Sequence, residues 1–221
     1  MPHAAWIDIS LPLRTGLAGW PGDPPTRVER IMDLSRGDPC TLSALSLCAH
    51  AGTHLDAPAH YLPGGATMDA LPLDAVIGPA RIIPIANPQA VTVAELRKHR
   101  IRAGQRLLFK TANATRPWDA PQFIEKFVAL EKDAADYLAA RKVRLVGVDG
   151  PSVSGFHDDH AAIHGALLAA GIWILEGLDL SQAPPGPTQL LCLPLRLTGS
   201  EAAPVRAFVK RRERDARWAT L

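Results

Sequence analysis

The chain has few cysteines and little net charge, and each of these features excludes a class of protein. Three cysteines occur among 221 residues, Cys40, Cys48 and Cys192. Such a sparse, odd count excludes a disulfide framework and is typical of unpaired thiols in a reducing cytoplasm. Lys and Arg exceed Asp and Glu by 24 − 22 = 2, too little to indicate a nucleic-acid partner. The one basic run, 210–217, is interrupted by two acidic residues and is expected to be solvated.

Long hydrophobic runs are also absent. No apolar stretch reaches the roughly 20 residues that a membrane-spanning helix needs. The first residues lack the basic segment and long apolar core of a signal peptide, so we expect a cytoplasmic protein with no membrane partner. The length permits one sizeable core. Because the 20 prolines and 17 glycines are scattered and form no linker, we expect one domain over 1–221.

The pattern of short apolar runs predicts more strands than helices. Gly, Pro or polar residues bound each run, as is typical of strands. The predicted strands are 81–86, 106–111, 143–149, 172–180, 189–198 and 205–210. Helical patterns cover 92–99, with Thr92 as the cap, 124–142, with a break partway, and 158–170, which Gly171 ends. This mixture predicts an α/β fold with a mixed or antiparallel sheet and flanking helices.

The segment 50–60 concentrates three histidines and an aspartate: His50, His54, Asp56 and His60. In a straight strand these side chains would share one face, but the strand would span roughly 33 Å, too far for them to meet. An extended segment that bends at its glycine and proline would let them converge. Imidazole and carboxylate groups are ligands that suit zinc or manganese, so the segment predicts a metal site. The alternative is a polar surface loop.

A carboxylate lies within a second apolar run. Glu176 follows Ile-Trp-Ile-Leu, so we expect it to be buried, and a buried charge needs a partner. A metal ion or a buried arginine would serve. His164 lies in the predicted helix 158–170, on the side of Leu167 and Leu168, and could bind the same ion. Without one, it would be an ordinary core histidine.

The eleven residues His50-Ala-Gly-Thr-His54-Leu-Asp56-Ala-Pro-Ala-His60 resemble the signature of the cyclase-like metal-dependent hydrolase family, to which bacterial kynurenine formamidases (arylformamidases) belong. The resemblance extends over nearly the whole chain, through DISLPL, WPGDPP, GVDGPSVS, ILEGLDLSQAPPG and LLCLPLRL. It implies a swivelling β/β/α core and a homodimer or higher homo-oligomer. After PSVS the sequence GFHDD departs from the formamidase pattern, which leaves the substrate open.

The resemblance also implies roles for individual residues. His50, His54 and Asp56 would hold the first of two divalent metal ions, zinc or manganese. Asp56 would reach the second, which His164 and Glu176 complete. His60 would be the general acid/base, and Trp20 would line the substrate pocket. His160, one helical turn before His164, would support the ligands or face solvent.

The activity that these roles imply is metal-dependent hydrolysis of an amide bond. Two cations lower the pKa of a water held between them, and the resulting nucleophile attacks the amide carbonyl. The expected substrate is an aryl formamide, N-formyl-L-kynurenine, cleaved to L-kynurenine and formate in tryptophan degradation. One alternative is a cyclic amide such as isatin, with segment 153–160 deciding between the substrates. Another is a non-catalytic metal-binding protein, which would need neither His60 nor a pocket at Trp20.

Overall fold

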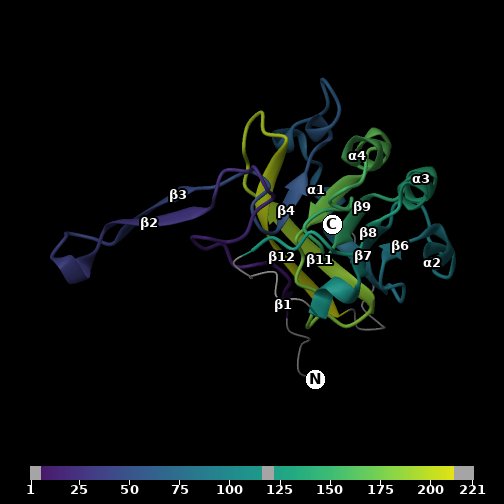
Figure 1. The fold of residues 1–221 in the computed structure, drawn as a ribbon, viewed down its shortest axis with the longest axis horizontal. Coiled ribbons are helices and arrows are strands. Elements are labelled where there is room, and N and C mark those ends of the chain that lie inside the picture. The colour runs from purple at the N-terminus through teal and green to yellow at the C-terminus, as the bar shows by residue number, and fades with distance from the viewer. Residues whose placement is uncertain (1–5, 116–121, 212–221) are drawn as a thin grey trace.

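The structure is a computed structural model that describes residues 6–115 and 122–211. The strands of its main sheet are β1 (Ile7–Asp8), β4 (His54–Asp56), β5 (Ile77–Pro84), β7 (Arg106–Lys110), β9 (Leu145–Val148), β10 (Trp173–Glu176), β11 (Gly186–Pro194) and β12 (Ala202–Arg211). They are ordered β1-β12-β11-β5-β7-β9-β10-β4, and β4 also pairs with β12, so the sheet closes on itself (Figure 1).

The sheet is mixed, as the sequence predicts. Strands β5, β7, β9 and β10 run parallel to one another, whereas β11, β12 and β4 join through antiparallel pairs. Successive residues of a strand point to opposite faces. In β7, Leu107 and Phe109 pack into one hydrophobic cluster and Leu108 into the other. Because both faces are covered, the central strands are apolar throughout rather than alternating with polar residues.

Three helices cover one side of the sheet: α2 (Val93–Arg97), α3 (Lys132–Ala140) and α4 (His160–Ala169) (Figure 1). Thr92 caps α2 as predicted, since its side chain accepts a hydrogen bond from the Glu95 backbone N–H. Gly171 follows α4 with a positive φ of 74°, a conformation that only glycine adopts without strain and that commonly ends helices.

The helix expected over 124–142 is only partly correct. A short strand, β8 (Ala129–Leu130), precedes α3 and pairs in parallel with β6 (Ala90–Val91). The Asn113 side chain bonds both the N–H and the carbonyl of Val128, which holds the chain extended there. These contacts come from distant segments, so a local helical pattern could not reveal them. The predicted strands 172–180 and 189–198 also end earlier than expected, at Glu176 and Pro194.

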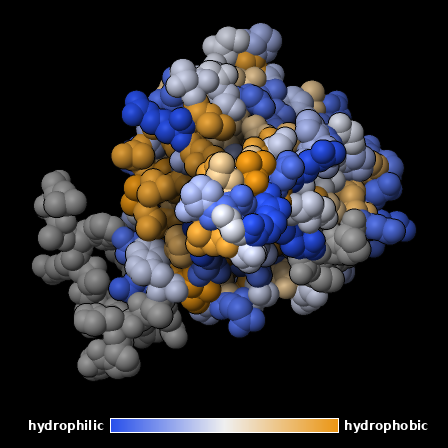
Figure 2. All heavy atoms as spheres, turned by 90° about the vertical axis from the view of Figure 1, so that its left-hand side faces the viewer, coloured by the Kyte–Doolittle hydropathy of each residue, from blue (hydrophilic) through white to orange (hydrophobic). Residues whose placement is uncertain are grey.

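A hairpin that the sequence analysis did not predict projects from the body. Its strands are β2 (Arg27–Met32) and β3 (Leu42–Ser46), and they form a separate two-stranded sheet (Figure 1). Its apolar side chains have little to pack against, and Ile31 and Leu45 remain 48% and 67% exposed. Figure 2 shows the face from which it projects, where hydrophobic residues gather in patches among hydrophilic ones.

Cys40, Cys48 and Cys192 are free thiols, as expected. Within 6–115 and 122–211, no helix combines the length and apolar character needed to cross a bilayer. Most of the basic run 210–217 lies outside the described residues.

Candidate metal centre

Strand β4 and the bends on either side of it bring the residues of the histidine motif together. The alternation of the strand sends Leu55 into the core, while His54 and Asp56 share the other face. Gly52, with φ of 63°, turns the chain before the strand. Pro58 begins a 3₁₀ turn after it, η2 (Pro58–His60). The segment is therefore extended and bent at both ends, as its glycine and proline predict.

Two other elements bring the remaining predicted residues to the same place. Strand β10 pairs with β4 so that Glu176 lies opposite His54, and it is buried, as expected. Helix α4 presents His164 with its Nε2 atom 3.2 Å from Oε1 of Glu176. No arginine is needed to accompany the buried carboxylate, because two histidines lie against it.

The distances between these side chains suit shared metal ions. Two ligand atoms on one tetrahedral zinc ion, each about 2.0–2.1 Å from it, lie roughly 3.3 Å apart. Oδ1 of Asp56 is 3.1 Å from Nδ1 of His50 and 3.5 Å from Nε2 of His54. Oε2 of Glu176 is 3.2 Å from Nε2 of His54. The other Asp56 oxygen, Oδ2, faces His164 at 4.0 Å, so the carboxylate faces two groups of ligands.

The hydrogen bonds of the histidines leave their inner nitrogens free to bind a cation. Nδ1 of His54 lies 3.0 Å from the Gly52 carbonyl, and Nδ1 of His164 lies 3.0 Å from the His160 carbonyl. A carbonyl only accepts, so each Nδ1 carries the proton and each Nε2 of the neutral ring offers a lone pair. These lone pairs point at carboxylate oxygens, an arrangement that requires a proton or a metal ion between them.

Burial of the polar atoms in this cluster also favours a bound cation. Among the described residues, Nε2 of His54 and both carboxylate oxygens of Asp56 are buried without a hydrogen-bond partner, and Asp56 is 0% exposed. A buried polar atom without a partner costs on the order of 1–3 kcal/mol, and a charged one costs more. Divalent cations bound between these side chains would satisfy all three atoms.

The pKa values show the same demand for positive charge. Burial lowers the pKa of His54, but Glu176 and Asp56 outweigh burial and raise it to about 9. The pKa of His164 is raised in the same way, against burial, by Glu176 and Asp56. Burial raises the pKa of Glu176, but His164 and His54 hold it well below its usual value. Glu176 thus stays ionised and attracts a cation.

Glu176 is oriented by a loop whose role the sequence analysis did not identify. Its Oε1 atom accepts hydrogen bonds from the Val153 backbone N–H at 2.7 Å and from the Ser152 hydroxyl at 3.2 Å. These bonds leave Oε2 directed at His54. Residues that hold a ligand in this way tune metal affinity. The block GVDGPSVS contains both residues, but nothing local in it indicates that it would meet Glu176.

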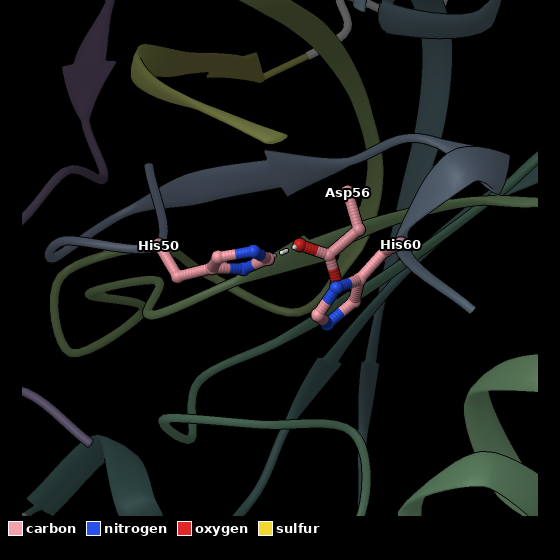
Figure 3. A group of neighbouring side chains, drawn as sticks. All are labelled: His50, Asp56 and His60. Atoms are coloured by element: carbon pink, nitrogen blue, oxygen red, sulfur yellow. Dashed lines mark ion pairs between the residues drawn. The ribbon is translucent and has the colours of Figure 1, made fainter. Parts of the chain in front are cut away.

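His60 lies at the edge of the cluster. The centroid of its ring lies 4.3 Å from that of the His50 ring, with the two planes tilted by 37°, and the Asp56 carboxylate points between the two rings (Figure 3). His50, Asp56 and His60 each offer an atom within 4.8 Å of the others, so position alone allows His60 to be a ligand. Burial lowers its pKa, which Asp56 opposes and the neighbouring His50 and His164 reinforce.

A pocket of about 190 Å³ opens directly onto the cluster. His54, His60, Glu176 and Trp20 are among the residues that line it. The Trp20 ring packs against aromatic rings at centroid distances of 5.1–5.2 Å. These rings belong to Phe123, Phe156 and His160.

His160 also lines the pocket and is half-buried. Its Nδ1 atom is 2.5 Å from the Ser154 hydroxyl, and its Nε2 atom is 3.3 Å from the Phe156 carbonyl. It therefore secures the 153–160 segment against the ligand helix. Phe123, which lines the pocket, and Phe156, which packs on Trp20, were not identified from the sequence, because isolated phenylalanines carry no signal that separates such positions from a core.

Comparison with known proteins finds relatives in both sequence and structure. The family model for putative cyclases matches residues 7–154. The chain is 36% identical over 210 residues to the kynurenine formamidase of Bacillus cereus, an alignment that covers 95% of this chain and 99% of that one. A solved structure of a potential metal-dependent hydrolase with cyclase activity superposes with a TM-score of 0.83 at 31% identity, over 95% and 98% of the two chains.

A more distant structure shares the fold. Isatin hydrolase A from Labrenzia aggregata superposes with a TM-score of 0.80 at 21% identity, over 93% of each chain. The closed mixed sheet defines an α/β fold that these structures share, and the relatives that match most of the chain are hydrolytic enzymes. The chain belongs to the putative cyclase family, and the membership predicted from its histidine motif is confirmed.

Proposed function

We propose that this protein is a metal-dependent amidohydrolase that cleaves an aryl formamide, N-formyl-L-kynurenine, to L-kynurenine and formate. The observation that carries the proposal is the buried Asp56 carboxylate, which faces imidazole nitrogens of His50 and His54. Both histidines line the same pocket as Trp20. The identity to kynurenine formamidases over 95% of the chain supports the choice of substrate.

The proposed metal site comprises His50, His54, Asp56, His164 and Glu176. The donor set of three imidazoles and two carboxylates fits two divalent ions, with zinc preferred and manganese possible. When bound, such ions supply an activated water and polarise the amide carbonyl. The two Asp56 oxygens, which face different histidines, support a shared ligand.

The protein side chains have two further tasks. Hydrolysis adds water to the formyl carbon and breaks the C–N bond, so one proton must move from the water to the leaving nitrogen. His60 lines the pocket beside the cluster, and its lowered pKa leaves it neutral near pH 7, able to accept that proton and then donate it. Trp20 offers an apolar ring on which the aniline ring of the substrate can stack.

A substrate panel with metal analysis tests this proposal. We expect the purified protein to contain zinc or manganese and to hydrolyse N-formylkynurenine, with turnover lost in a chelator and restored by the metal. Isatin, measured on the same preparation, tests the cyclic amide alternative, which the 153–160 wall would have to accommodate. Metal binding without turnover of either compound would support a non-catalytic metal-binding protein and contradict the proposal.

We also propose that the protein forms a homodimer through the β2–β3 hairpin. An isolated two-stranded hairpin is marginally stable in water. This one projects from the body with Val28, Ile31, Leu42 and Leu45 exposed, and clusters of exposed apolar side chains mark interfaces. Light scattering should give twice the chain mass. Replacing Ile31 and Leu45 together by Ser should release monomers, and a monomeric wild-type protein would contradict the dimer.

A further inference from the structure

The outer nitrogen of His50 faces a carboxylate that lies outside the histidine motif. Oε1 of Glu201 is 3.4 Å from Nε2 of His50, while Nδ1 of the same ring faces Asp56 at 3.1 Å. The outer nitrogen of His50 thus has a carboxylate beside it, whereas the outer nitrogens of His54 and His164 lie beside backbone carbonyls. Each of the three rings has one nitrogen directed into the cluster and an oxygen beside the other.

The pairing of β12 with β4 brings Glu201 to this position. Ala202 lies opposite Asp56, and the Ala57 backbone N–H donates to the Glu201 carbonyl at 2.8 Å. The backbone of Glu201 is therefore fixed against the strand that carries two of the proposed ligands. Nothing in the local sequence TGSEAAP indicates a site, because 145 residues separate Asp56 from Glu201 and only the closure of the sheet joins them.

We propose that Glu201 is a positioning residue that orients His50 for metal binding. The inference rests on the proposed metal site. Glu201 lies beside the ring nitrogen directed away from the cluster, so an ion bound at Nδ1 is out of its reach and it is no ligand. At 3.4 Å from Nε2, the carboxylate favours a proton on that nitrogen, the tautomer that leaves the Nδ1 lone pair facing Asp56. A carboxylate behind a ligand histidine also makes the ring a stronger donor to the metal.

The solvent exposure of Glu201 and His50 determines how much the loss of Glu201 should weaken metal binding. The side chain of Glu201 is 44% exposed and that of His50 is 17% exposed. Water can therefore partly replace the carboxylate when it is removed. Supporting residues of this kind typically change metal affinity by about 10–100-fold, and we expect Glu201 to fall near the lower end. Glutamine keeps an acceptor but loses the charge, so its effect should be smaller than that of alanine.

The test measures metal affinity directly. The apoproteins of wild type, Glu201→Ala and Glu201→Gln are titrated with Zn²⁺ in competition with a chromophoric chelator. Glu125→Gln is the matched control, since Glu125 forms a surface pair of similar length, 3.5 Å, with His157. We expect about tenfold weaker binding of one ion in Glu201→Ala, a smaller loss in Glu201→Gln, and no change in the control. The absorption spectrum of bound Co²⁺ should also shift in Glu201→Ala.

Each result decides between the alternatives. Affinity within twofold of wild type in Glu201→Ala, with an unchanged Co²⁺ spectrum, overturns the inference alone. A fall in apoprotein melting temperature that accounts for the whole loss of affinity, equal in Ala and Gln, also overturns it, because Glu201 would then only stabilise the fold. A wild-type protein that binds no zinc overturns the metal site together with this inference.

Discussion

Glu176 lies directly opposite His54 across the antiparallel pair β4–β10, and its Oε2 atom is 3.2 Å from Nε2 of His54. The neighbouring pair, Leu175 and Leu55, points to the other face and packs in the core. A slip of one residue in this register would exchange the two faces. Hydrophobic burial of the leucines therefore fixes the position of the proposed ligands.

Replacing Glu176 by Gln should remove metal while the fold remains. The amide keeps an acceptor for the Val153 N–H but lacks the charge that binds a cation. We expect metal affinity to fall by more than the roughly 10–100-fold typical of residues that merely support a ligand, and activity to fall with it. Elemental analysis and circular dichroism measure the two effects. Full metal content in a folded, inactive variant would show that Glu176 is no ligand.

His60→Gln separates the roles of acid/base and ligand. Loss of a general acid or base typically lowers rate by about 10²–10⁴-fold, so we expect kcat to fall in that range with normal metal content. His99→Gln is the control, since His99 follows α2 and does not line the pocket. Loss of metal from His60→Gln, in proportion to activity, would instead assign His60 to the metal, which its distance from Asp56 permits.

Gly177→Ala should disrupt the junction between the two segments that carry the ligands. Gly177 has φ of 66°, and a Cβ atom there would lie 2.3 Å from the Gly52 carbonyl oxygen. Gly171 has φ of 74° with no atom within 4 Å of such a Cβ, so Gly171→Ala is the control for backbone strain alone. That strain costs about 1–2 kcal/mol. We expect a larger loss of unfolding free energy in Gly177→Ala, with reduced metal content. Equal losses would show that the close approach is unimportant.

Asp149 should make stability depend on pH in an unusual direction. It is fully buried and accepts hydrogen bonds from the Thr111 N–H and hydroxyl. Burial outweighs these bonds and raises its pKa from 3.8 to about 6. The folded state therefore holds the proton more tightly than the unfolded state. The resulting stabilisation is fully present below pH 3.8 and is lost as pH rises through about 6.

Asp149→Asn provides the measurement, because asparagine does not titrate. A shift of about two pKa units corresponds to about 3 kcal/mol. From pH 4 to 7, wild type should lose roughly that much unfolding free energy relative to the variant, in urea unfolding with a chelator present. The comparison cancels the contributions of all other groups. Parallel stability curves for the two proteins would contradict the raised pKa.

Sequence patterns predict features whose causes are local. The bends at Gly52 and Pro58 and the end of α4 at Gly171 are set by backbone chemistry of single residues, so they can be recognised in the sequence. Burial of Glu176 follows from its apolar neighbours. All of these are found in the structure.

Features that depend on distant pairing could not be predicted. Strand β8 exists because β6 and Asn113 hold it extended. Glu201 lies beside His50 only because the sheet closes. Ser152 contacts Glu176 although the two residues lie in different segments of the chain. The β2–β3 hairpin lacks a buried face, so its sequence does not alternate between apolar and polar residues in the way that identifies a strand.

Trp20→Ala should impair aryl substrates selectively. Phe123, Phe156 and His160 pack on the indole, which is itself part of the pocket lining. Aromatic contacts of this kind contribute about 0.5–1.5 kcal/mol beyond the area they bury. We therefore expect kcat/KM for N-formylkynurenine to fall about tenfold or more, mainly through KM, while an aliphatic formamide without a ring changes little. Trp20→Phe, which keeps a ring, should lie between wild type and Trp20→Ala. An equal loss for both substrates would mean that Trp20 supports the pocket wall and does not contact the substrate ring.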